Sequence, residues 1–116
     1  RNRRREELGM PSWVSRHSEP HRKLNLLEKR IGRLRGAVKA GEGAAHVAVA
    51  AEKLRLAALA VIKAKLALIG EYPRRDPDGR ASRKLRQDAD RWTSLPTQAI
   101  VERYGEPDRD GPRERT

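Results

Sequence analysis

Clustered basic residues are the feature of this sequence best suited to chemistry. Residues 22–39 hold seven lysines and arginines and one acidic residue, Glu28, so this segment has a net charge of +6. Lysines and arginines that replace the counterions of a nucleic acid gain affinity without reading its base sequence. Residues 92–116 have a net charge of −1. The charge is therefore uneven along the chain, as expected for a directed binding face.

Two sets of residues are predicted to contact nucleic-acid phosphates. The first set consists of Arg22, Lys23, Lys29, Arg30 and Arg33. The second set consists of Arg74, Arg75, Arg80, Arg83 and Lys84. Contacts of this kind position a protein on nucleic acid but do not specify a sequence, so RNA and DNA both remain open. The alternative is a solvated surface that reflects the composition of a chain with 20 arginines and 15 alanines.

Two aromatic residues adjoin basic ones. Tyr72 precedes Arg74 and Arg75, and Trp92 follows Arg91. A ring beside a guanidinium can stack on an unpaired base, or it can pack inside the protein. For Trp92 we expect packing on the helical core, because it ends the apolar stripe of a predicted helix. For Tyr72 both alternatives stay open.

Other residue patterns that could indicate catalysis, metal binding or nucleotide binding lack the required spacing or neighbouring residues. The chain has no cysteine, which excludes disulfide scaffolds and thiolate chemistry. His17 and His21 have the spacing of zinc ligands on a helix, but no third ligand accompanies them. Residues 36–41 have the glycine spacing of a phosphate loop, but Glu42 and Gly43 stand where Lys and Ser or Thr are needed. No carboxylates are arranged for acid–base catalysis. We therefore predict a non-enzymatic protein with no metal site and no cofactor.

One short segment, TQAIVERYGEP at residues 97–107, resembles the first helix and glycine turn of helix-turn-helix proteins. A recognition helix would have to follow Gly105. The chain ends there in PDRDGPRERT, which has no apolar side chain to pack such a helix. An ordinary short helix that stops at Gly105 is the better interpretation.

The apolar residues predict an all-α fold built on two long helices. Sixteen of the 22 Leu, Ile and Val residues lie in residues 24–69. In the first helix, at about 19–40, spacings of three and four form a seam that packs lengthwise on a partner helix. The seam consists of Leu24, Leu27, Ile31, Leu34 and Val38. Gly41 and Gly43 interrupt the pattern before a second helix at about 44–69, and so short a connection predicts an antiparallel hairpin.

Capping residues and glycines add detail to this hairpin. Ser18 is the predicted N-cap of the first helix, with Pro20 in its first turn. Gly70 is predicted to follow the last turn of the second helix. Gly32 and Gly36 lie one turn apart in the first helix. We interpret them as points of close approach to the second helix; the alternative is that each merely weakens its helix by about 1 kcal/mol.

The second helix is apolar on too many sides for one partner helix to cover. A helix that is apolar all round is normally buried, and each Leu or Ile left in water forgoes about 1.5–3 kcal/mol. We therefore predict that a third helix, a second copy or a larger assembly packs on it. The predicted protein-interface residues are Leu54, Leu59, Val61, Ile62, Leu66 and Ile69. These residues support an alternative function, a structural subunit that self-assembles through residues 44–69.

The remaining sequence divides around the hairpin. The predicted parts are a basic arm at 1–17, the hairpin core at 18–70, a turn-rich linker at 71–79, short helices at 80–105, and a charged tail at 106–116. Within 80–105 we expect one helix at about 80–92 and another at 97–104.

The overall composition bounds location and partners. The chain has 116 residues and a net charge of +11, which is the size of one small domain and a charge suited to a polyanionic partner. The longest uninterrupted apolar run is residues 56–62, whereas a membrane span needs about 20. The first residues, RNRRREE, precede no apolar signal segment. We expect an intracellular protein, in the cytoplasm or an organelle matrix and not secreted, that binds nucleic acid and associates with other subunits or with itself.

Overall fold

The computed structural model describes residues 18–105 of the chain, and within this range it contains α-helices, one short 3-10 helix and no strand. The elements are α2 (Glu19–Lys39), α3 (Ala44–Glu71), η1 (Pro73–Arg75), α4 (Arg80–Ser94) and α5 (Thr97–Tyr104). The predicted all-α class and both short C-terminal helices are thereby confirmed. The predicted arm at 1–17 and tail at 106–116 lie outside the described residues.

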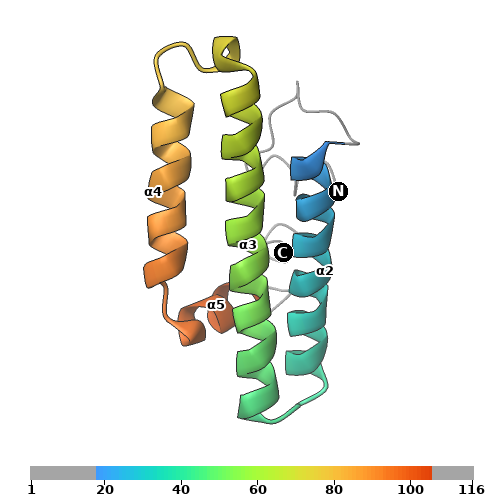
Figure 1. Cartoon of the computed structure of the whole chain (residues 1–116). Coiled ribbons are helices and arrows are strands. Elements are labelled where there is room, and N and C mark those ends of the chain that lie inside the picture. The colour runs from blue at the N-terminus through green and yellow to red at the C-terminus, as the bar shows by residue number, and fades with distance from the viewer. Residues whose placement is uncertain (1–17, 106–116) are drawn as a thin grey trace, which may run out of the picture.

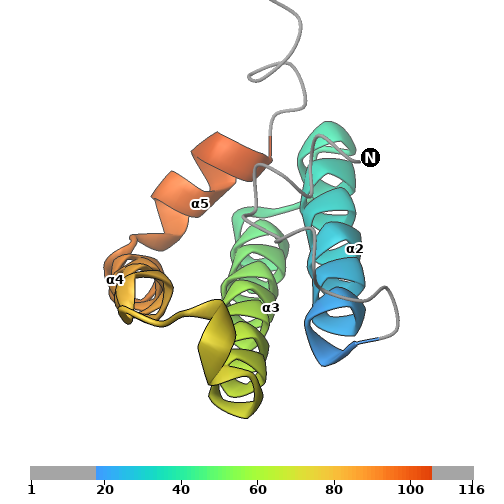
Figure 2. The ribbon, with the colours of Figure 1, turned by 90° about the horizontal axis from the view of Figure 1, so that it is seen from above.

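Three helices lie side by side with α3 in the centre. Figure 1 shows α2 on one side of α3 and α4 on the other, each running antiparallel to it. Seen from above in Figure 2, the short α5 lies against one side of this layer, where it packs on α3 and α2. The described part of the chain places no helix on the opposite side of α3. The predicted hairpin therefore becomes the α2–α3 pair of a three-helix layer, and α4 and α5 supply the further cover that α3 needs.

The start of α2 follows its sequence signals. The Ser18 hydroxyl accepts a hydrogen bond from the His21 amide at 3.5 Å, and Pro20 lies in the first turn. This side chain satisfies one of the amides that a helix N-terminus leaves unpaired. At the other end, Gly41 has a φ of +71°. That left-handed conformation suits glycine and lets the chain reverse into α3.

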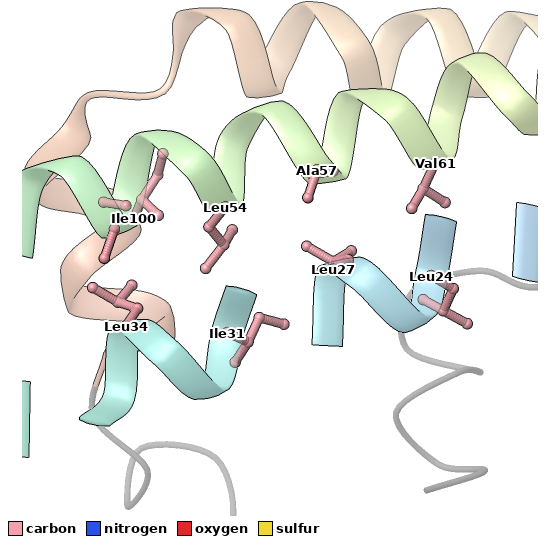
Figure 3. Close-up of a cluster of buried hydrophobic side chains, with 11 residues drawn as sticks. Leu24, Leu27, Ile31, Leu34, Leu54, Ala57, Val61 and Ile100 are labelled. Atoms are coloured by element: carbon pink, nitrogen blue, oxygen red, sulfur yellow. The ribbon is translucent and has the colours of Figure 1, made fainter. Parts of the chain in front are cut away.

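The core lies between α2 and α3 and is closed by α5. Leu24, Leu27, Ile31 and Leu34 are at most 2% exposed, so the predicted seam of α2 is confirmed, with Val38 partly buried at its edge. They pack on α3 residues such as Leu54, Ala57 and Val61. Figure 3 shows Ile100 of α5 near Leu34 and Leu54 at one end of this cluster.

The end of α3 differs from the prediction. The helix continues through Gly70 to Glu71, and the Tyr72 amide still bonds to the Leu68 and Ile69 carbonyl oxygens at 3.1 Å. Gly70 does not have the positive φ that ends many helices. The stop comes from Pro73, because a proline disfavours helical dihedral angles in the residue before it. Tyr72 accordingly has φ −129° and ψ 68°.

The predicted linker forms a compact turn that caps the start of α4. The Asp76 carboxylate accepts hydrogen bonds from the Ala81 amide at 3.0 Å, the Ser82 amide at 3.0 Å and the Ser82 hydroxyl at 2.6 Å. Gly79, directly before the helix, has a φ of +72°. Asp76 therefore fulfils the role of an N-cap from four residues before α4.

The predicted close approach at Gly32 and Gly36 is wrong. Both glycines are exposed, and a β-carbon added to either would meet no atom within 4 Å. They lie away from the seam on α2, so α3 does not pass over them. In these two positions glycine weakens the helix without a packing gain.

Candidate nucleic-acid interface

All ten residues predicted to contact phosphates lie at the surface. Eight of them are exposed, and the other two, Lys23 and Arg30, are half-buried. Residues seven apart on a helix share a face, which explains the half-buried pair at the flank of the seam. Arg22, Lys29 and Arg33 lie on the face of α2 that points away from α3, as their exposure shows.

The fold places part of the first set in the same half of the layer as the second, on the opposite side of α3. In Figure 1 the start of α2 and the turn between α3 and α4 lie at the same end of the layer. Arg22 and Lys23 are in the first turns of α2, and the whole second set lies in or after η1. The rest of the first set, Lys29 to Arg33, continues along α2 toward the other end. The two sets thus share one end of the molecule but do not form one continuous cluster.

Ion pairs engage several of the cations of α2. Arg22 Nη2 lies 2.8 Å from Glu19 Oε1, Lys23 Nζ lies 3.5 Å from Glu19 Oε2, and Arg33 Nη1 lies 3.3 Å from Glu42 Oε2. The hydrogen bond from Arg22, with the charges of Arg22 and Lys23, holds the pKa of the Glu19 carboxyl below its usual value. Exposed pairs of this kind contribute little to stability. Phosphates are therefore able to compete with these carboxylates.

The second set surrounds the capped turn before α4. Arg80 Nε lies 3.7 Å from Asp78 Oδ2, and Arg83 Nη1 donates to the Asp78 carbonyl oxygen at 3.5 Å. The Ser82 hydroxyl and the amides of Ala81 and Ser82, with the charge of Arg83, lower the pKa of the Asp76 carboxyl. Asp76 is thus used to begin α4. The hydrogen bonds of this turn hold its basic residues at the start of α4.

The two aromatic residues that adjoin basic ones differ in burial. Trp92 is half-buried against the core and stacks on Tyr104, with ring centroids 5.6 Å apart and an angle of 22° between the planes. The expected packing of Trp92 is confirmed. Tyr72 is 55% exposed at the end of α3, directly before η1. Its ring is accessible at the end of the layer that carries the second set.

The predicted protein-interface residues divide into two groups, which corrects the expected surface. Leu54, Val61 and Ile62 are at most 7% exposed, because the other helices of this chain cover them. The remaining three, Leu59, Leu66 and Ile69, are half-buried.

The most exposed large apolar side chains of α3 are two others, Leu56 at 65% and Val49 at 54%. They are seven residues apart and share the face that no described helix covers. The seven-residue spacing can be seen in the sequence. Because this helix is apolar all round, however, the spacing does not predict which of its faces is left uncovered by other helices.

Two charged residues outside the predicted sets face a cavity between the helices. Lys65 of α3 is 6% exposed, and Asp88 of α4 lines the same cavity. Burial lowers the pKa of the Lys65 ammonium to about 8, and the charge of Asp88 acts in the opposite direction. Lys65 follows Ala51 and Ala58 at intervals of seven, so it lies on a buried face. In the sequence, this spacing is the signal that relates Lys65 to this buried face.

Neither a family model, nor a curated protein, nor a solved structure matches this chain. Among residues 18–105, no helix is long and apolar enough to cross a membrane. Over the same range, no three His, Cys, Asp or Glu residues are grouped so as to hold a metal ion.

Proposed function

We propose that this is a non-enzymatic protein that binds nucleic acid mainly through phosphates, as a subunit of a ribonucleoprotein or DNA-handling assembly. One observation carries the proposal: all ten candidate cations are at the surface, and Arg22 and Lys23 lie at the same end of the layer as the second set. A polyanion that crosses this end meets both sets. The face of α2 then offers Lys29 and Arg33 further along.

The energetics favour phosphates over the present partners of these cations. Each surface carboxylate holds its cation in high dielectric, where a pair is worth about 0–1 kcal/mol. A nucleic acid presents many phosphates at once, and each cation that replaces a condensed counterion releases it. The binding strength then depends on the number of contacts and on salt, with little dependence on base sequence.

A salt titration tests this proposal. Fluorescence anisotropy with labelled single-stranded and duplex RNA and DNA should show an affinity that falls linearly with salt on logarithmic axes, from about 50 to 300 mM. The double variants Arg74→Gln/Arg75→Gln and Lys29→Gln/Arg33→Gln should each reduce the slope by about 1–2. Lys53→Gln, which removes an exposed cation outside both sets, serves as the matched control.

Two outcomes contradict the proposal. The first is an affinity that does not change with salt. The second is a slope of affinity against salt that is the same in the double variants as in Lys53→Gln. The comparison of RNA with DNA, and of single strands with duplexes, identifies the preferred nucleic acid.

A structural subunit that self-assembles through α3 is the second candidate. The uncovered face of α3, with Leu56 and Val49 more than half exposed, favours it. Exposed apolar patches mark interaction surfaces when they are contiguous. The test is the double variant Val49→Ser/Leu56→Ser, with molar mass measured by light scattering after size exclusion. Loss of an oligomer, with helicity unchanged and no nucleic-acid binding by the parent chain, would support this candidate in place of the first.

A further inference from the structure

Tyr72 is an exposed aromatic ring beside basic residues. Residues 18–105 hold three aromatic residues, and two of them, Trp92 and Tyr104, are half-buried and stack on each other with ring centroids 5.6 Å apart. The Arg103 guanidinium lies 5.6 Å from the centre of the Tyr104 ring. Tyr72, by contrast, is 55% exposed at the end of α3. Packing in the core therefore accounts for Trp92 and Tyr104, but it does not account for the position of Tyr72.

Hydrogen bonds hold the backbone of Tyr72 at the turn between α3 and α4. Its amide donates to the Leu68 and Ile69 carbonyl oxygens, both at 3.1 Å, and its carbonyl oxygen accepts from the Arg75 amide at 2.9 Å. The pyrrolidine ring of Pro73 fixes the φ angle of the residue that follows Tyr72. The direction in which the Tyr72 side chain leaves the backbone is therefore set before a ligand arrives, which lowers the entropy lost on binding.

The same turn carries the cations of the second set. Arg74 and Arg75 form η1 together with Pro73, directly after Tyr72. The Asp76 amide donates to the Pro73 carbonyl oxygen at 3.0 Å, and the Asp76 carboxylate accepts hydrogen bonds from two amides of the first turn of α4. One hydrogen-bonded turn therefore joins the backbone of Tyr72 to the start of α4, where the other cations of the second set lie.

Positive charge exceeds negative charge in this turn. Residues 71–84 hold the five cations of the second set and three acidic residues, which gives a net charge of +2. Two of the acidic residues are used by the turn itself, because Asp76 caps α4 and Asp78 Oδ1 accepts a hydrogen bond from the Arg80 amide at 3.1 Å. The turn therefore attracts an anionic ligand to the surroundings of the Tyr72 ring.

A flat ring among cations suits a ligand that carries both flat faces and negative charges. A nucleic-acid strand has this chemistry, because each nucleotide joins a base to a phosphate. Aromatic side chains stack on bases that are unpaired, whereas in a duplex the bases already stack on one another. An acidic side chain of a peptide supplies the charge but not the flat face. The turn thus fits an unpaired nucleotide better than a duplex or an acidic peptide.

We propose that the Tyr72 ring is a stacking platform for an unpaired base, so that single-stranded nucleic acid is the ligand class of this turn. The phosphates of the strand lie against the second set, with Arg74 and Arg75 nearest in the chain to the ring. Stacking of this kind accepts any base, because every base has a flat face. This inference rests on the proposed function and specifies the nucleic acid that it concerns.

An abasic strand separates stacking from phosphate binding. Fluorescence anisotropy compares the full chain bound to a single strand of mixed sequence with the full chain bound to an abasic strand of the same length, which has the same phosphates and no bases. The parent should bind the strand with bases at least about fivefold more tightly. The slope of affinity against salt should be the same for both strands, because both release the same counterions.

Tyr72→Ala tests the ring itself. It should lower the affinity for the strand with bases at least about fivefold, to that of the abasic strand. It should leave the affinities for the abasic strand and for a long duplex unchanged. Tyr72→Trp should retain tight binding, and Leu56→Ala, which truncates an exposed side chain elsewhere on α3, is the matched control. Circular dichroism checks that each variant is folded, and the comparison of the two strands with the parent chain needs no variant.

Four results would overturn the stacking platform. They are equal affinities of the parent for the two strands, an unchanged affinity of Tyr72→Ala for the strand with bases, an equal loss for both strands in that variant, and tighter binding of a polyglutamate peptide than of the strand. In the first three cases an affinity that still falls with salt leaves the proposed function standing. An affinity that does not change with salt contradicts the proposed function instead, so the two failures are distinguishable.

Discussion

Thr97, the first residue of α5, donates a hydrogen bond from its hydroxyl to the Glu52 carboxylate of α3. Glu52 also accepts hydrogen bonds from Arg55, at 2.9 Å and 3.2 Å. The Arg55 guanidinium reaches further and donates to the carbonyl oxygens of Trp92 and Thr93 in the last turn of α4. The Trp92 carbonyl oxygen also accepts a hydrogen bond from the Leu95 amide at 3.4 Å, and a cation at a helix C-terminus is favourable. This network fixes the α4–α5 junction on α3.

Arg55→Met should therefore destabilise the fold. The Arg55 side chain is 13% exposed, and its loss removes the hydrogen bonds that join Glu52 of α3 to the last turn of α4. We expect the free energy of unfolding to fall by about 1–3 kcal/mol in urea titrations. Lys53→Met, an exposed neighbour, should change it by less than about 0.5 kcal/mol. Equal effects of the two substitutions would contradict the role of this network.

Replacing glycines with alanine should change the free energy of unfolding in opposite directions at different positions. Gly32→Ala and Gly36→Ala place a methyl group in open space on an exposed helix, so each should raise the free energy of unfolding by about 0.5–1 kcal/mol. Gly105→Ala should lower it, because the added β-carbon would lie 2.5 Å from the Val101 carbonyl oxygen and 3.1 Å from Val38 Cγ2. Thermal melts distinguish these effects. Destabilisation by Gly32→Ala would show that α2 is packed at that face.

Acid should selectively weaken the start of α4. The Ser82 hydroxyl and two backbone amides lower the pKa of Asp76. The stabilisation it provides is present above the pKa of the unfolded chain and is lost as the pH falls through the lower folded pKa. Asp76→Asn should therefore have a lower Tm than the parent at pH 6, and the gap should narrow at pH 2. A gap of the same size at both pH values would rule out this carboxylate as the cap.

The sequence predicts α2 well because that helix is amphipathic. Its seam alternates spacings of three and four between charged residues, so Leu24 and Leu34 are assigned to the core with no knowledge of the partner helix. The same contrast places Lys29 and Arg33 at the surface. The bounds of α5 also follow from local signals, because Pro96 and Gly105 flank it.

The buried sector of α3 cannot be predicted in this way. Leu54 is fully buried and Leu56 is 65% exposed, yet both are leucines two residues apart in the same helix and point about 200° apart. Which of them is covered depends on where α4 and α5 return to pack. The cavity and the shared end of the two basic sets depend on the same tertiary arrangement. For this reason the sequence alone does not predict that Lys65 is a charged residue in a buried sector.

Lys65 should also make stability depend on pH in a characteristic direction. Burial lowers its pKa from the ordinary 10.5 to about 8, against the raising effect of Asp88. Between these values the unfolded chain binds the proton and the folded chain does not, so the free energy of unfolding rises with pH across this window.

Lys65→Met isolates this contribution from the other groups that titrate in alkali. At pH 7 the ammonium is charged in both the folded and the unfolded chain, so its burial is fully unfavourable there, and the variant should be more stable by about 1–3 kcal/mol. The difference should shrink as the pH rises from about 8 toward 10.5, because the parent then loses the buried charge. Urea titrations of both proteins at pH 7, 8.5 and 10 measure this difference in the free energy of unfolding. A parent that is as stable as Lys65→Met at pH 7, or a difference that grows with pH, would mean that the cavity does not penalise the ammonium.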